Sequence, residues 1–372
     1  MQARLAGDRR IAEREVERLL NLDPAERRET VERAYKRYRT PAFVERMIEQ
    51  ARVFLPHDHH ESLALLAVAE RQVPRISRHV YGHALIQRLS LRLLAHQANA
   101  HRVAGDLRAA EARFAEIPPL PSPESPDDCA LQGELASLEA SLRYDQRRLR
   151  RADALLERAE RLYQRTGDAI GLLKVLIQRG SILYCGGQPE RAIPHYEAAN
   201  AAVDADADPA LALDARHNLV LCLCSVGHSQ AARDLLEATR GLYQRVGDAT
   251  SVNQLLWIEG TVAAALGEDR RALERLRSAR DGYTERGLDF DAALVSLDLA
   301  EVHLGRGETA EVQHIARRMA HTFSERGVGR EAFRAIAMFH EAARAERVTL
   351  ELIARTRSAL LRLSRRPRRR PA

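Results

Sequence analysis

The chain has 372 residues, of which 45% are hydrophobic but only 5% aromatic, so its buried surfaces must be built mainly from Leu, Ala, Val and Ile. Its 58 basic and 52 acidic residues give a formal charge of +6, and six of the Arg lie from Arg362 onward. The rest of the chain is therefore near neutral, which does not favour a nucleic-acid groove in its body. No apolar run approaches the roughly 18 residues of a membrane helix, and the first residues lack the apolar segment of a signal peptide, so a cytoplasmic protein without a membrane partner is predicted.

Helices are predicted at 9–21, 24–38, 41–54 and 60–73, before any clear repeat begins. Asp23 followed by Pro24, and Thr40 followed by Pro41, are pairs in which a capping residue precedes a first-turn proline. We interpret residues 1–91 as a divergent helical capping region. A DNA-reading helix-turn-helix within 24–50 is the alternative, although the turn RYRTP holds no glycine and no base-reading face is evident.

A 40-residue repeat follows. One glycine column is Gly187, Gly227, Gly267 and Gly307, and five residues after each stand Ala192, Ala232, Ala272 and Val312. A second column is Gly167, Gly247, Gly287 and Gly327, each preceded four residues earlier by Tyr163, Tyr243, Tyr283 and Phe323. Glycine is favoured where a helix ends in a left-handed turn, so two columns per period predict two helices per unit.

The repeat divides the rest of the chain. Helix pairs are predicted near 130–166, 169–206, 209–246, 249–286 and 289–326, and Gly105 with Ala110 marks an earlier unit. A proline-rich connector occupies 118–127 within the repeat region 92–329, since dense proline cannot continue a helix. Residues 330–363 are predicted to be a C-terminal capping helix pair, and 364–372 a disordered basic tail.

The repeat resembles the tetratricopeptide family. That family places Gly or Ala midway along the first helix and Ala, an aromatic or large apolar residue, and Ala along the second; the matching residues are Gly180, Ala192, Tyr196 and Ala199. The period exceeds the family's usual length of about 34 residues and resembles its longer bacterial variants. The resemblance implies an all-α fold, a right-handed α-solenoid of helix-turn-helix repeats. It also implies a non-enzymatic scaffold or adaptor that binds a protein or peptide in bacterial regulation or signalling.

In that family the first helices line the concave binding groove. The matching positions form a mixed aromatic and polar set: Lys174, Ser181, Tyr184, Asp214, His217, Asn218, Gln254, Trp257 and Thr261. Ile177 also maps there but is expected to pack between helices. The carboxylate clamp of chaperone-binding members is absent at this register, because only Asn218 fits it.

Three other interpretations remain. The tail could anchor a nucleic-acid-associated adaptor through Arg365, Arg366, Arg368, Arg369 and Arg370. The cluster His57, His59, His60 and Glu61, with His79 and His83, could bind a metal, but Asp58 serves equally well as a helix cap. No nucleophile or phosphate-binding motif indicates an enzyme. We therefore predict no catalytic residue, metal or cofactor, and the sequence leaves the oligomeric state open.

Overall fold

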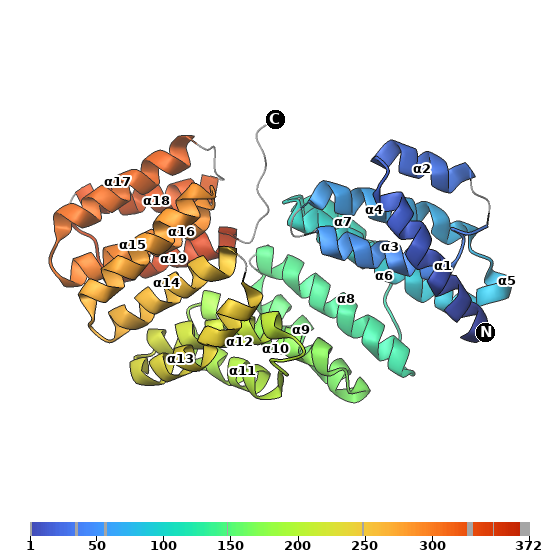
Figure 1. The fold of residues 1–372 in the computed structure, drawn as a ribbon, viewed down its shortest axis with the longest axis horizontal. Helices are drawn as coiled ribbons and strands as arrows, with labels where there is room; N and C mark the ends of the chain where they lie inside the picture. Colours follow the sequence, from blue (N-terminus) through green and yellow to red (C-terminus); the bar gives the residue numbers. More distant parts are fainter. Residues whose placement is uncertain are drawn as a thin grey trace. The chain divides into compact units, whose positions relative to one another are not determined.

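The structure is a computed structural model. It describes residues 2–33, 36–55, 58–146, 148–247, 249–325, 330–344 and 346–364. The described residues form α-helices, one short 3-10 helix and connecting turns, and no strand (Figure 1). The helices of the first part are α1 (Gln2–Leu20), α2 (Pro24–Arg33), α3 (Pro41–Phe54), α4 (His59–Gln72), η1 (Val73–Arg75), α5 (Arg78–Tyr81), α6 (His83–Val103), α7 (Leu107–Ala115), α8 (Pro126–Asp145) and α9 (Leu149–Thr166).

The later helices form pairs at the predicted spacing. They are α10 (Ala169–Cys185), α11 (Pro189–Ala202), α12 (Pro209–Ser225), α13 (Ser229–Val246), α14 (Ala249–Ala265), α15 (Asp269–Glu285), α16 (Asp289–Gly305), α17 (Thr309–Glu325), α18 (Arg330–Arg344) and α19 (Leu350–Ser364). The all-α helical-repeat fold is thus confirmed. Among the described helices, none is long and apolar enough to cross a bilayer.

The chain divides into two compact units, one reaching Gly171 and the other starting at Leu172, and each is described by itself. In the first unit, α3 packs against α1, α4 and α6 and buries Phe43, Met47 and Ile48. The Thr40 hydroxyl accepts the Phe43 N–H at 3.2 Å, which confirms the cap predicted at the start of α3. The capping function predicted for residues 1–91 stays a prediction.

The connector before α8 ends earlier than predicted. Helix α8 begins at Pro126 rather than near residue 130, because proline is compatible with the first helical turn. The Ser125 hydroxyl caps this turn by accepting the Asp128 N–H at 3.1 Å. Within the connector, the Pro121 carbonyl accepts a hydrogen bond of 2.9 Å from the Gln132 side chain, so α8 holds the segment that precedes it.

The second unit repeats one helix-turn-helix geometry. The turns inside its pairs contain Gly187, Gly227, Gly267 and Gly307, with φ between 73° and 80°. These values lie in the left-handed region, so the conformation predicted for this glycine column is confirmed. Five residues later the small side chains of Ala192, Ala232 and Ala272 are each 0% exposed, as expected where neighbouring helices cross closely.

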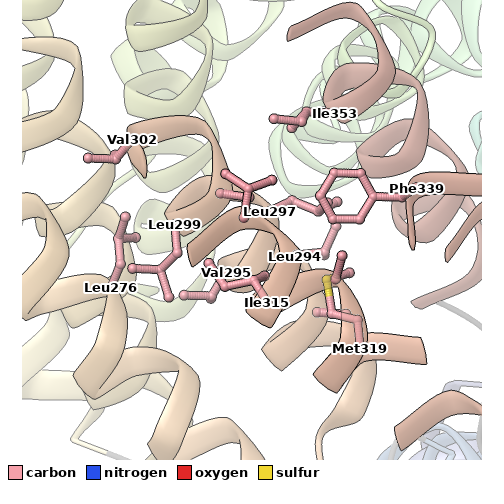
Figure 2. Packing of buried hydrophobic residues seen from close by; sticks show 14 of the residues in the cluster. Leu276, Leu294, Val295, Leu297, Leu299, Val302, Ile315, Met319, Phe339 and Ile353 are labelled. Carbon is pink, nitrogen blue, oxygen red and sulfur yellow. The ribbon is translucent and has the colours of Figure 1, made fainter. Parts of the chain in front are cut away.

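The last two helices complete the core of the second unit. Helix α18 contacts α17, while α19 lies against both α16 and α18. Figure 2 shows Phe339 of α18 and Ile353 of α19 beside Leu294 and Leu297 of α16. All four side chains are nearly or fully buried. Because α19 packs on α16, its side chains reach the row of first helices to which α12, α14 and α16 belong.

Candidate functional site

The predicted binding residues lie on the first helices of three successive pairs, α10, α12 and α14. We call the exposed and half-buried residues of this predicted set the first-helix face. Its exposed members are Lys174 and Asp214. Its half-buried members are Tyr184, His217, Asn218, Gln254, Trp257 and Thr261. Ile177 is half-buried and packs against the apolar clusters of the unit, as expected.

Ser181 does not belong to the exposed part of this face. Its side chain is 4% exposed, and its hydroxyl lies 3.0 Å from the Tyr196 hydroxyl of α11. Tyr196 is itself 0% exposed, so the pair satisfies two polar groups between α10 and α11. The sequence interpretation of Ser181 as a groove residue is therefore corrected, because its side chain is buried against Tyr196 of the second helix.

A series of ring contacts joins the first-helix face to the second helices. His217 and Trp257 lie edge to face at a centroid distance of 6.4 Å. Trp257 also meets Tyr283 of α15 at 6.1 Å, and His217 meets Tyr243 of α13 at 6.3 Å. The His217 Nδ1 atom shares a 2.7 Å hydrogen bond with the Tyr243 hydroxyl. These contacts fix the two rings on the face while leaving each partly exposed.

Burial controls the charge on this face. It lowers the pKa of His217 to about 4, so the imidazole is neutral near pH 7. Burial raises the pKa of the Tyr184 phenol to about 12, and the Arg357 cation opposes that rise. Arg357 belongs to α19, so a charge from the last helix acts on a residue of α10. The neutral aromatic groups thus share the face with a cation that the sequence interpretation did not place there.

That cation is part of a charged cluster beside Trp257. The Arg357 Nη2 atom lies 2.6 Å from Asp298 Oδ1 and 2.6 Å from Glu301 Oε2, both on α16. The Trp257 indole N–H donates to the other Asp298 oxygen at 2.5 Å. Burial raises the pKa of Asp298, while Arg357 and the indole hydrogen bond oppose the rise. Burial disfavours the charged form of Arg357, but Asp298 and Glu301 outweigh it and raise the pKa of the guanidinium.

Sequence reasoning missed Asp298, Glu301 and Arg357. The repeat carries a signal for the first two of them, because Asp298 stands 80 residues, two periods, after Asn218, and Glu301 stands 40 residues, one period, after Thr261. Extending the groove positions from three units to the next would have identified both. Arg357 lies beyond the regular repeat, so no column leads to it.

The histidine cluster and the arginine tail were the alternative sites that the sequence offered. The rings of His59 and His60 lie at the start of α4 with a centroid distance of 4.2 Å and are tilted by 37°. The Asp58 carboxylate accepts the Glu61 N–H there at 3.0 Å and caps the helix. His57 lies outside the described residues. Over the part of the chain that the structure describes, no group of three His, Cys, Asp or Glu side chains could hold a metal ion. The tail residues Arg365, Arg366, Arg368, Arg369 and Arg370 also lie outside the described residues.

Comparison with known proteins supports the fold. The sequence matches no protein-family model and no curated protein. A Rap protein solved in complex with competence and sporulation factor has a TM-score of 0.64 at 12% identity, covering 85% of this chain and 86% of that one. BtubC (BKLC) from P. vanneervenii has a TM-score of 0.48 at 18% identity, with 66% and 92% covered. Aspartyl phosphate phosphatase F from Bacillus subtilis has a TM-score of 0.46 at 13% identity, with 83% and 94% covered. The Rap protein is a TPR-like helical-repeat protein, and the similarity extends that fold to this chain.

Proposed function

We propose that this protein is a non-enzymatic adaptor that binds an extended peptide or protein segment on the first-helix face of its second unit, and that it acts in bacterial regulation or signalling. The observation that carries the proposal is the partly exposed ring pair His217–Trp257, held in place from two successive first helices. Rigid aromatic groups supply large contact areas at a low entropic cost, which makes them frequent anchors of interfaces.

The polar groups around the rings support an extended ligand. Tyr184, Asn218 and Gln254 are half-buried polar residues on three consecutive first helices. Such side chains can satisfy the backbone N–H and C=O groups of a peptide that has no secondary structure of its own. The Rap protein of similar fold was solved with competence and sporulation factor bound, which is consistent with a small regulatory ligand for this chain as well.

The same residues offer little for catalysis. The His217 imidazole is hydrogen-bonded to Tyr243, and no serine or cysteine nucleophile is described within hydrogen-bonding distance of it. Cys222 and Cys224 lie on the same helix, but burial raises the pKa of each thiol to about 12, so both remain protonated and unreactive at neutral pH. A binding role therefore fits this face better than covalent chemistry.

A peptide selection tests the proposal. A pool of random hexapeptides is passed over the immobilised full chain, and enriched sequences are measured by calorimetry against the wild type and Trp257→Ala. We expect the substitution to weaken binding by about 2 kcal/mol or more, because a central aromatic anchor is lost. The matched control is Val252→Ala on the same helix, since Val252 is 52% exposed and lies outside the face. Enriched peptides that bind Trp257→Ala as tightly as the wild type would refute the proposed site.

A further inference from the structure

The cluster around Asp298 has the composition of a binding site for a guanidinium group. It brings together the indole of α14, two carboxylates of α16 and one guanidinium from α19. The side chain of Asp298 is 14% exposed and that of Arg357 is 25% exposed, whereas Glu301 is 45% exposed. The cluster is therefore sheltered on the Asp298 side and open to solvent on the Glu301 side.

A guanidinium suits these partners better than an ammonium ion. It is planar and weakly hydrated, and its several N–H donors point in fixed directions. One nitrogen of Arg357 already bridges the two carboxylates, while the indole N–H satisfies the remaining Asp298 oxygen. Charge-assisted bonds of this kind are the strong ones in proteins. A charged Asp298 without a partner would be costly to bury, so the site favours a bound cation.

Arg357 is able to leave the cluster without unfolding its helix. Helix α19 is held by its buried residues Ile353 and Leu360, which belong to the core of the second unit. The guanidinium stands at the end of a long side chain with several rotatable bonds. A rotamer change therefore moves the charge into solvent while Ile353 and Leu360 stay in place.

The cluster also continues the first-helix face. Asp298 occupies the repeat position of Asn218, and its carboxylate is bonded to Trp257. A peptide lying along α12 and α14 would reach the Asp298 carboxylate at one of its ends. Any arginine side chain at that end could replace Arg357 bond for bond, which removes the cost of leaving the carboxylate unpaired.

We infer that Asp298, Glu301 and Trp257 form a guanidinium subsite, which Arg357 fills in the free protein and an arginine side chain of the ligand takes over on binding. This inference rests on the proposed peptide-binding function. Arg357 of α19 then competes with the ligand's arginine for the subsite. The affinity of the subsite for the ligand is set by the exchange of one guanidinium for the other. A ligand with a neutral residue at that position leaves Arg357 where it is.

The test removes the Arg357 side chain from the subsite and measures the binding of a small arginine probe. N-acetyl-arginine amide is titrated into the full chain, and binding is followed by the emission of Trp257, the only tryptophan of the chain. We expect Arg357→Ala to bind the probe at least tenfold more tightly than the wild type does, because the internal competitor is gone. N-acetyl-citrulline amide, a neutral isostere of the probe, should not bind either protein. Adding Asp298→Asn to the Arg357→Ala variant should abolish the gain.

Two further variants separate the subsite from general loosening of α19. Arg357→Gln keeps most of the side-chain length and should show the same gain, and it replaces Arg357→Ala if melting curves show that the alanine variant is unfolded. Arg355→Ala removes an exposed arginine of the same helix and should behave as the wild type. The inference fails if neither Arg357 variant gains affinity, if citrulline binds as well as arginine, or if Arg355→Ala gains equally. In that case, peptides from the random pool whose binding depends on Trp257 would still support the proposed function. Conversely, a gain in probe affinity by Arg357→Ala, with no such peptide found, would count against the proposed function alone.

Discussion

Substituting Gly180 by alanine tests the closest helix approach in the second unit. A Cβ atom built on Gly180 would lie 2.7 to 2.9 Å from three ring atoms of Tyr196. Ordinary contacts between carbon atoms are about 3.5–4.0 Å, so the ring or the helix must move by most of an ångström. The ring is 0% exposed, and its hydroxyl is 3.0 Å from the Ser181 hydroxyl, so moving it would also strain that hydrogen bond.

The expected cost follows from these contacts. Overpacking of a well-packed core costs roughly 1–3 kcal/mol, and loss of the hydroxyl bond adds about 1 kcal/mol if the ring turns away. Replacing glycine by alanine within a helix stabilises the folded state by roughly 0.5–1 kcal/mol. We therefore expect Gly180→Ala to lower the free energy of unfolding of the second unit by about 1–3 kcal/mol.

Gly241→Ala is the matched control. Gly241 lies within α13, is exposed, and an added Cβ would meet nothing within 4 Å. Only the helix-propensity gain remains there, so this variant should be more stable than the wild type by roughly 0.5–1 kcal/mol. Urea unfolding followed by Trp257 emission reports on the second unit for both variants, and an unchanged slope validates the comparison. The packing described for α10 and α11 would be wrong if Gly180→Ala were as stable as Gly241→Ala.

Three further substitutions or conditions have definite expected outcomes. Ala272→Leu enlarges a side chain that is 0% exposed and should cost on the order of 1–3 kcal/mol in urea unfolding; a neutral result would mean that the repeat is misaligned. Because the folded pKa of His217 is about 4 and the unfolded value about 6.5, the unfolded state binds more protons between these values, so stability falls as the pH falls from 6.5 towards 4. The loss is at most about 3 kcal/mol, and His217→Gln should flatten this part of the curve of stability against pH; an equally steep curve would contradict it. Deleting the chain from Glu331 onward removes α18 and α19 and exposes the apolar core beneath them, so light scattering should detect aggregation or the melting temperature should fall, and a monomer with unchanged melting would show that the pair protects nothing.

The sequence predicted the packing of the repeat, but not which polar side chains are buried within it. The columns at Gly187 and Ala192 recur because each unit needs the same left-handed turn and the same close crossing, so their period reveals the geometry directly. Ser181 shows where this reasoning ends. Position alone placed it on the groove side of α10, but glycine at 180 lets Tyr196 approach, and the serine then satisfies the tyrosine hydroxyl. Such a pairing depends on two side chains in different helices and leaves no periodic trace.

The repeat also explains why Asp298 differs from the residues at the equivalent positions of the other units. Positions 178, 218, 258 and 298 carry Gln, Asn, Ile and Asp, so this column varies while the neighbouring alanine column stays small. A column that is free of a shared packing requirement can hold a different group in each unit. Asp298 lies on α16, the first helix that packs against α19, and there Arg357 supplies the cation that a half-buried carboxylate needs. The Asp298–Arg357 pair thus depends on a last helix that packs on the first-helix row, so we expect any ligand specificity of this face to depend on α19 as well as on the regular units.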